Sequence, residues 1–192
     1  MGLFDTILGR TRPVKPDLDQ LFSLPSAAMT LQAASNILPL GCGSVCVKAA
    51  EGGAFAGLRE EIEQLLAIDA DDGTRKYDQT TDTYGFSWLT RRTSPDDISG
   101  LVTDLHAVNS TLDEAGFGPA LLCTLVAFGD GQAPTFGLVY LYKRGTWYPF
   151  APVGPNKRDN ARELQIRAML GDDLKVESDL SRWFPVWGAP GL

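Results

Sequence analysis

The cysteines and the single histidine of this chain have the side chains best suited to nucleophilic chemistry. A catalytic thiol needs a base, and the base needs a group that orients it. Cys46 or Cys123 with His106 and Asp104 would supply such a set, so a small thiol-dependent enzyme is one alternative function. However, Asp104 and His106 lie two positions apart on a predicted helix, about 200° around its axis, and cannot face each other. We therefore expect no catalytic residues and no enzymatic activity.

Metal and cofactor chemistry finds little support in the sequence. The spacing of the three cysteines matches no familiar zinc-binding pattern. We interpret Cys42, Cys46 and Cys123 as small, reduced, buried thiols. The acidic run at 69–72 lacks the spaced carboxylates and the distal Glu of a calcium loop. No glycine-rich phosphate loop or dinucleotide fingerprint is present. We expect neither a metal nor a cofactor.

Aromatic and basic residues, in contrast, gather in the stretch "YKRGTWYPFAP" at residues 142–152. One interpretation is a buried core hairpin, because aromatic residues fill sheets readily. The other is a binding patch of the Trp, Tyr and Arg type that dominates interface energetics. The candidate contacts of this patch are Tyr142, Arg144, Trp147, Tyr148 and Phe150.

The two ends of the chain are also apolar. Residues 1–16 form a predicted N-terminal arm, whose apolar side chains at helical spacing precede basic residues and prolines. At about two turns, such a helix needs a surface on which to fold, either a partner protein or a membrane. The arm's candidate contacts are Leu3, Phe4, Ile7 and Leu8.

The tail at residues 178–192 contains Trp183 and Trp187, whereas chain ends are usually small, polar and mobile. We expect an intramolecular strap with at least one tryptophan packed on the domain, because prolines at 185 and 190 lower the entropy of the free tail. If both tryptophans were bare, the tail would become the leading docking site.

Composition limits the choice of partners. The chain has 192 residues, a formal net charge of -7 and a pI near 4.7. Nucleic-acid binding relies on a dense set of Lys and Arg, so nucleic acid is excluded as a partner. No apolar run approaches a membrane span, and the first residues do not match a signal peptide. We expect a cytoplasmic protein, with peripheral membrane contact through the arm as an alternative.

Periodicity predicts a single α+β domain over residues 17–192. Two helices are expected at 16–34, with a kink at Pro25, and at 53–69. Two more are expected to begin at N-cap residues, one at Ser94 with Pro95 at N1 and the other at Asp159. Strands are expected at 43–50, 83–92, 120–128, 135–144 and 146–152, the last three in a meander. This pattern gives an antiparallel sheet of about five strands, with helices packed on one face and the aromatic tail strapped onto the domain.

Longer stretches show a resemblance over nearly the whole chain. The most specific are "DLHAVNSTLDEAGFGP" at 104–119, "YKRGTWYPFAP" at 142–152 and "DLSRWFPVWGAPGL" at 179–192, together with "MGLFDTILGR" at the start. They resemble the PspA-associated protein PspAB family of actinobacteria. The resemblance implies a cytoplasmic accessory of the phage-shock response that associates with the coiled-coil stress protein PspA. It implies no established enzymatic activity and supplies no catalytic residues.

The sequence therefore favours a non-enzymatic adaptor of envelope-stress signalling that binds a protein partner such as PspA. Besides the thiol-dependent enzyme, a chaperone-like α+β binding protein is an alternative, supported by fold analogy alone. The sequence leaves the oligomeric state and the docking surface open.

Overall fold

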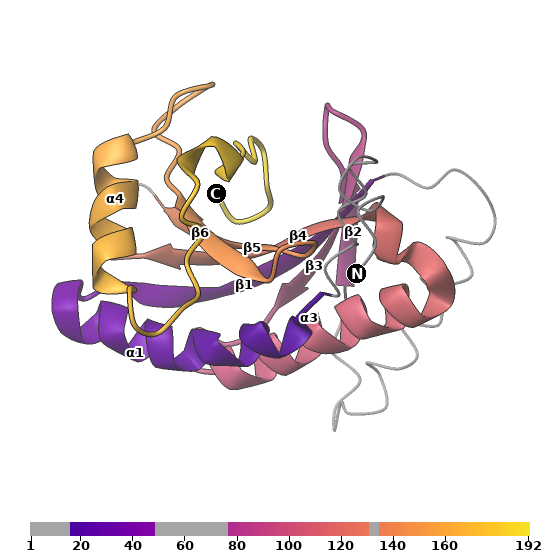
Figure 1. Ribbon diagram of the computed structural model, residues 1–192, viewed down its shortest axis with the longest axis horizontal. Coiled ribbons are helices and arrows are strands. Elements are labelled where there is room, and N and C mark those ends of the chain that lie inside the picture. Colours follow the sequence, from indigo (N-terminus) through magenta and orange to yellow (C-terminus); the bar gives the residue numbers. More distant parts are fainter. Residues whose placement is uncertain (1–15, 49–76, 131–134) are drawn as a thin grey trace, which may run out of the picture.

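The computed structural model describes residues 16–48, 77–130 and 135–192, and its fold is an open sheet with helices on one side (Figure 1). The strands are β1 (Leu38–Lys48), β2 (Tyr77–Thr81), β3 (Phe86–Arg92), β4 (Leu121–Gly129), β5 (Phe136–Leu141) and β6 (Thr146–Phe150). The helices are α1 (Leu24–Ser35), α3 (Ile98–Leu112) and α4 (Asn160–Met169), with short helical turns η1 (Leu18–Ser23), η2 (Asp113–Phe117), η3 (Gly118–Ala120) and η4 (Leu180–Arg182). The predicted arm and the helix predicted at 53–69 lie outside the described residues.

The six strands form one antiparallel sheet in the order β2-β3-β1-β4-β5-β6. The α+β class and the C-terminal meander of β4, β5 and β6 are confirmed, but the expected number of about five strands is wrong. The additional strand, β2, has the sequence YDQTT and is largely exposed at the sheet edge. It lacks the apolar alternation by which a half-buried strand is recognised, so periodicity could not reveal it.

Helices α1 and α3 cover one face of the sheet (Figure 1). On α3, Leu101 and Leu105 lie so close to β1 that a Cβ at Gly43 would meet the Leu105 side chain at 2.6 Å. The start of α3 differs from its prediction, because the N-cap is Asp97 and not Ser94. The Asp97 side chain accepts a hydrogen bond from the backbone N–H of Gly100 at 3.0 Å, which satisfies a helix-end donor.

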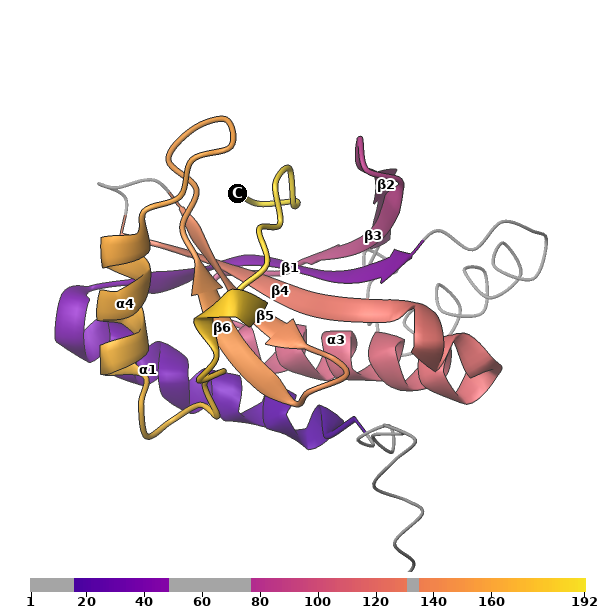
Figure 2. The same cartoon turned by 45° about the horizontal axis from the view of Figure 1, so that its top comes forward.

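The C-terminal tail covers the other face of the sheet, above the strands in Figures 1 and 2. The described part of the chain therefore has two apolar cores. One lies between the sheet and the helices, with α4 packed against β6 and α1. The other lies between the sheet and the tail and includes Cys46, Trp88, Cys123, Tyr148 and Trp183. The predicted strap is confirmed, and the N-cap of α4 is Asp159, as the sequence predicts.

Candidate functional site

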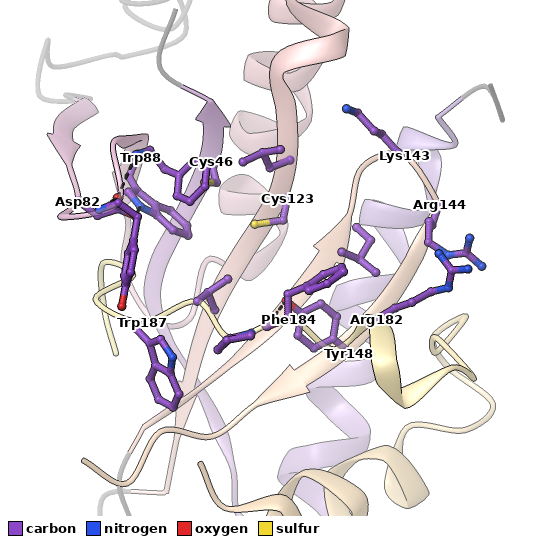
Figure 3. Close-up of a pocket in the computed structure, with 16 residues that line it drawn as sticks. Cys46, Asp82, Trp88, Cys123, Lys143, Arg144, Tyr148, Arg182, Phe184 and Trp187 are labelled. Carbon is purple, nitrogen blue, oxygen red and sulfur yellow. Dashed lines mark hydrogen bonds between the residues drawn. The ribbon is translucent and has the colours of Figure 1, made fainter. Parts of the chain in front are cut away.

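An apolar groove of about 750 Å³ opens on the tail side of the sheet. Its floor is the sheet, one wall is the turn of the β2–β3 hairpin, and another is the tail at residues 184–187 (Figure 3). Its volume falls within the range of pockets that hold small molecules, about 300–1,000 Å³. We refer to it as the strap-side groove.

The floor of the groove consists of side chains from five neighbouring strands, β3, β1, β4, β5 and β6. Cys46 on β1 and Cys123 on β4 stand directly opposite each other in the sheet register, and Trp88 on β3 and Tyr148 on β6 flank them. All four are buried. Since side chains alternate between the two faces of a strand, this set belongs to one face, and several of the residues beside it in sequence pack in the core between the sheet and the helices: Val45, Val47, Leu89 and Trp147.

The hairpin wall is organised by Asp82. Its Oδ1 atom accepts hydrogen bonds from the backbone N–H groups of Tyr84 and Phe86, both at 2.9 Å. Its Oδ2 atom accepts a hydrogen bond from Trp88 Nε1, also at 2.9 Å (Figure 3). One carboxylate thus fixes the turn and orients the indole beneath it. Tyr84 and Phe86, on either side of a glycine at positive φ, line the groove from this wall.

The tail wall is fixed to the sheet by both polar and aromatic contacts. Trp183 is only 6 % exposed, and its Nε1 donates to the carbonyl oxygen of Glu177 at 3.0 Å. The hydroxyl of Tyr148 donates to the carbonyl oxygen of Phe184 at 2.8 Å, and the Tyr148 and Trp183 rings stack at 6.0 Å between centroids. Trp187 packs edge-on against Phe150 at 4.9 Å. These contacts place the backbone so that Phe184 and Trp187 line the groove.

A third wall is basic. Lys143 and Arg144 lie in the turn between β5 and β6, and Arg182 lies in η4. Lys143 Nζ donates to the carbonyl oxygen of Pro119 at 2.8 Å. Each arginine pairs through its Nε atom with a carboxylate: Arg144 with Glu177 at 2.6 Å and Arg182 with Asp179 at 3.0 Å. The three cations lie on the side of the groove away from Asp82 and Trp88 (Figure 3).

The carboxyl group of Glu177 gives a testable pH dependence. Burial alone would raise its pKa, but hydrogen bonds from Arg144, the Asp179 backbone N–H and Thr146 outweigh burial and lower the pKa from its ordinary value of 4.5. A carboxyl group whose pKa is lower in the folded state stabilises that state above its ordinary pKa. This contribution disappears as the pH falls through the folded-state pKa.

We expect the unfolding free energy of the wild-type protein to be higher than that of the Glu177→Gln variant. The difference should be constant above about pH 5.5, and it should shrink as the pH falls below the ordinary pKa of the carboxyl group. The neutral glutamine cannot respond to protonation, so the difference isolates this carboxyl group. Denaturant titrations between about pH 3 and pH 7 measure it. A difference that stays the same across the whole range would contradict the assignment.

The structure does not bring together the cysteine, histidine and aspartate that could have formed a thiol-based catalytic set. Burial raises the pKa of Cys42, and the hydrogen bond with Cys123, followed by burial, raises that of Cys46. His106 lies on α3 beside Phe22, with ring centroids 4.8 Å apart. Asp104 instead accepts a hydrogen bond from Arg91 Nε at 2.7 Å. Because thiol nucleophiles act as thiolates, raised thiol pKa values give no support to a thiol-dependent enzyme.

The candidate residues from sequence fall into four groups. Tyr142, Trp147 and Phe150 are buried in the cores, as the hairpin interpretation expects, and do not form an exposed patch. Tyr148 and Trp183 are also buried, and they support the groove from below and from the tail. Arg144 and Trp187 line the groove directly. The arm residues Leu3, Phe4, Ile7 and Leu8 lie outside the described residues.

The sequence did not indicate Asp82, Tyr84 or Arg182 as parts of a site. Lys143 and Phe184 lie in the patch stretch and in the apolar tail, but they were not among the candidate contacts. The run of Asp82, Thr83, Tyr84 and Gly85 contains a turn signal that could have indicated the hairpin. The remaining positions share no motif, and only the path of the tail over the sheet brings them together.

Two further properties bear on the class of protein. Within the described segments, no helix combines the length and apolar character needed to cross a membrane. In the same part of the chain, no three His, Cys, Asp or Glu side chains gather in a way that suits a metal ion.

These features define an α+β protein with a six-stranded antiparallel sheet, helices on one face, and a strap and apolar groove on the other. A protein-family model described as PspA associated protein B matches residues 1–191, and the chain belongs to this PspAB family. The family name indicates an association with PspA, in agreement with an accessory role. No curated protein and no solved structure matches the chain.

Proposed function

We propose that this protein is a cytoplasmic, non-enzymatic accessory of the phage-shock response that binds PspA through the strap-side groove. The observation that carries the proposal is the groove itself, an apolar hollow of about 750 Å³ walled by the tail and the β2–β3 hairpin. Membership of the PspAB family supports PspA as the partner.

The rim of the groove has the composition of a protein-binding surface. Tyr84 and Phe184 remain 60 % and 58 % exposed although both are large aromatic side chains. They line the same groove as Trp187 and two arginines, and Trp, Tyr and Arg are the residues most often dominant in protein interfaces. Exposed apolar surface of this kind, rimmed by polar groups, favours a binding role over a purely structural one.

A groove variant should lose the partner without losing the fold. We expect the double variant Tyr84→Ser and Phe184→Ser to weaken PspA binding about tenfold or more, because each side chain offers an interface contact worth over 1 kcal/mol. Its melting temperature should stay close to that of wild type, since both side chains are exposed. Binding is measured by titrating purified PspA into the full-length protein.

The matched control is Met29→Ser with Leu164→Ser, which removes two exposed apolar side chains from α1 and α4, outside the groove. This control should bind PspA as wild type does. Equal affinities of the groove variant, the control and wild type would refute the groove as the docking site.

The N-terminal arm remains a proposed second contact, with the partner or with a membrane surface. Its apolar side chains at Leu3, Phe4, Ile7 and Leu8 need a surface to fold on. The titrations above keep residues 1–15 in place, so any contribution of the arm is the same for all variants and does not affect the comparison.

A further inference from the structure

The charges on the lining of the strap-side groove are unequally distributed. Lys143, Arg144 and Arg182 lie on one wall, and Asp82 is the single acidic residue among the described residues that line the groove. The chain as a whole carries a net charge of -7. A cationic wall on an acidic protein is therefore a local feature that net charge does not predict.

The carboxylate of Asp82 is engaged within the β2–β3 hairpin. Its two oxygen atoms accept hydrogen bonds from the N–H groups of Tyr84, Phe86 and the Trp88 indole. It also lies on the side of the groove away from the three cations (Figure 3). A ligand in the groove consequently meets an apolar floor and one basic wall, with the acidic group already engaged in the hairpin turn.

The two arginines are held in place while they remain accessible. Glu177 and Asp179 bind the Nε atoms of Arg144 and Arg182, and both guanidinium groups stay partly exposed. Glu177 is itself buried and fixed by Thr146 and by the Asp179 backbone N–H. A guanidinium group presents several donors in a fixed fork, so an arginine bound at Nε can still donate to a second carboxylate through its terminal nitrogens.

We propose that the groove takes an acidic amphipathic segment of a protein partner, with apolar side chains on the floor and carboxylates against Lys143, Arg144 and Arg182. This inference rests on the proposed function of the groove and adds the chemistry of the occupant. A protein segment fits better than an anionic membrane, because membrane contact needs protruding apolar side chains and this apolar surface is recessed between the hairpin and the tail.

Two synthetic peptides test the charge requirement on the full-length protein. Both are helical, about 14 residues long, with Leu and Phe on one face. One carries Glu beside that face, and the other carries Lys at the same positions. We expect the Glu peptide to bind about tenfold more tightly at low salt, with the preference shrinking as salt is raised. Anisotropy of a labelled peptide gives the affinities, and tryptophan emission reports entry, because Trp88 and Trp187 line the groove.

Reversing charges on the basic wall of the groove tests the inference more directly than the peptides alone. The double variant Lys143→Glu and Arg182→Glu should invert the preference, so that the Lys peptide binds more tightly, and it should weaken PspA binding by a similar factor. The control, Lys157→Glu with Lys175→Glu, makes the same charge change at exposed positions outside the groove lining and should keep the wild-type preference.

Equal binding of the two peptides to wild type, or an unchanged preference after charge reversal, would overturn the inference. So would binding to phosphatidylglycerol vesicles through Lys143 and Arg182 with no binding of the Glu peptide. The proposed function fails separately, if Tyr84→Ser with Phe184→Ser leaves PspA binding unchanged. If charge reversal leaves PspA binding intact but Tyr84→Ser with Phe184→Ser abolishes it, PspA uses the groove without the acidic contacts.

Discussion

Replacing Trp183 with alanine is expected to lower the free energy of unfolding by about 3–5 kcal/mol, the usual cost of truncating a buried aromatic side chain. Trp183 is the main anchor of the strap. Its indole N–H donates to the Glu177 carbonyl, its ring stacks on Tyr148, and the guanidinium of Arg167 lies 6.0 Å from the ring centroid. The variant loses all three contacts and leaves the Glu177 carbonyl without this donor.

The measurement is a urea titration of wild type and Trp183→Ala, with Phe184→Ala as the control. Phe184 is the next residue in the same strap, but its side chain is exposed and only its carbonyl group holds Tyr148. The control should cost about 0.5 kcal/mol or less. If the two variants lost equal stability, the strap would be held by its backbone, and the tryptophan would not be its anchor.

The second large effect is expected at Arg158, which joins three parts of the chain. Its Nε atom donates to both carboxylate oxygens of Glu163, at 2.9 and 3.0 Å, and its Nη1 atom donates to the carbonyl of Trp183. The guanidinium lies 5.1 Å from the centroid of the Phe150 ring. Glu163 is only 2 % exposed. Arg158 thus supplies the positive charge next to a buried carboxylate and connects α4 with the strap.

Arg158→Met should therefore destabilise the protein by about 3–5 kcal/mol, because Glu163 stays buried without its cation. Adding Glu163→Gln should recover part of this loss, since it removes the uncompensated charge, and the double-mutant cycle gives the coupling energy. The control, Arg182→Met, breaks the exposed pair with Asp179 and should cost about 0–1 kcal/mol. A similar small loss for Arg158→Met would contradict the structural role assigned to this pair.

The elements that could be predicted from sequence are those with strong local patterns. The apolar stripe of α3, the cap of α4 at Asp159 and the meander of β4, β5 and β6 follow from periodicity and turn residues. Strand β2 could not be predicted, because its polar residues lie at an edge and gain their conformation from pairing with β3. The cap of α3 was misplaced because Ser94 and Asp97 are both good cap residues and only the structure distinguishes them.

The candidate site was less predictable than the fold. The role of the 142–152 stretch could not be assigned from its sequence. The aromatic residues that alternate in a strand can pack into one core and one exposed surface, or into two cores. The tail resolves this question. It covers the face to which Tyr148 and Phe150 point, whereas Trp147 packs on the helix side. The groove forms from what the tail leaves uncovered, so no single stretch of the sequence encodes it.

The position of the strap along the chain also determines when the groove can form during synthesis. The buried residues of the helix-side core lie between positions 21 and 174, whereas the strap-side core includes Trp183 and Ala189. A chain leaves the ribosome N-terminus first, so the residues of the helix-side core are available before those of the strap. The helix face of the sheet can therefore close while the other face is still bare. The groove can form only after residues 183–187 have left the ribosome, so a nascent chain does not yet carry the proposed docking site.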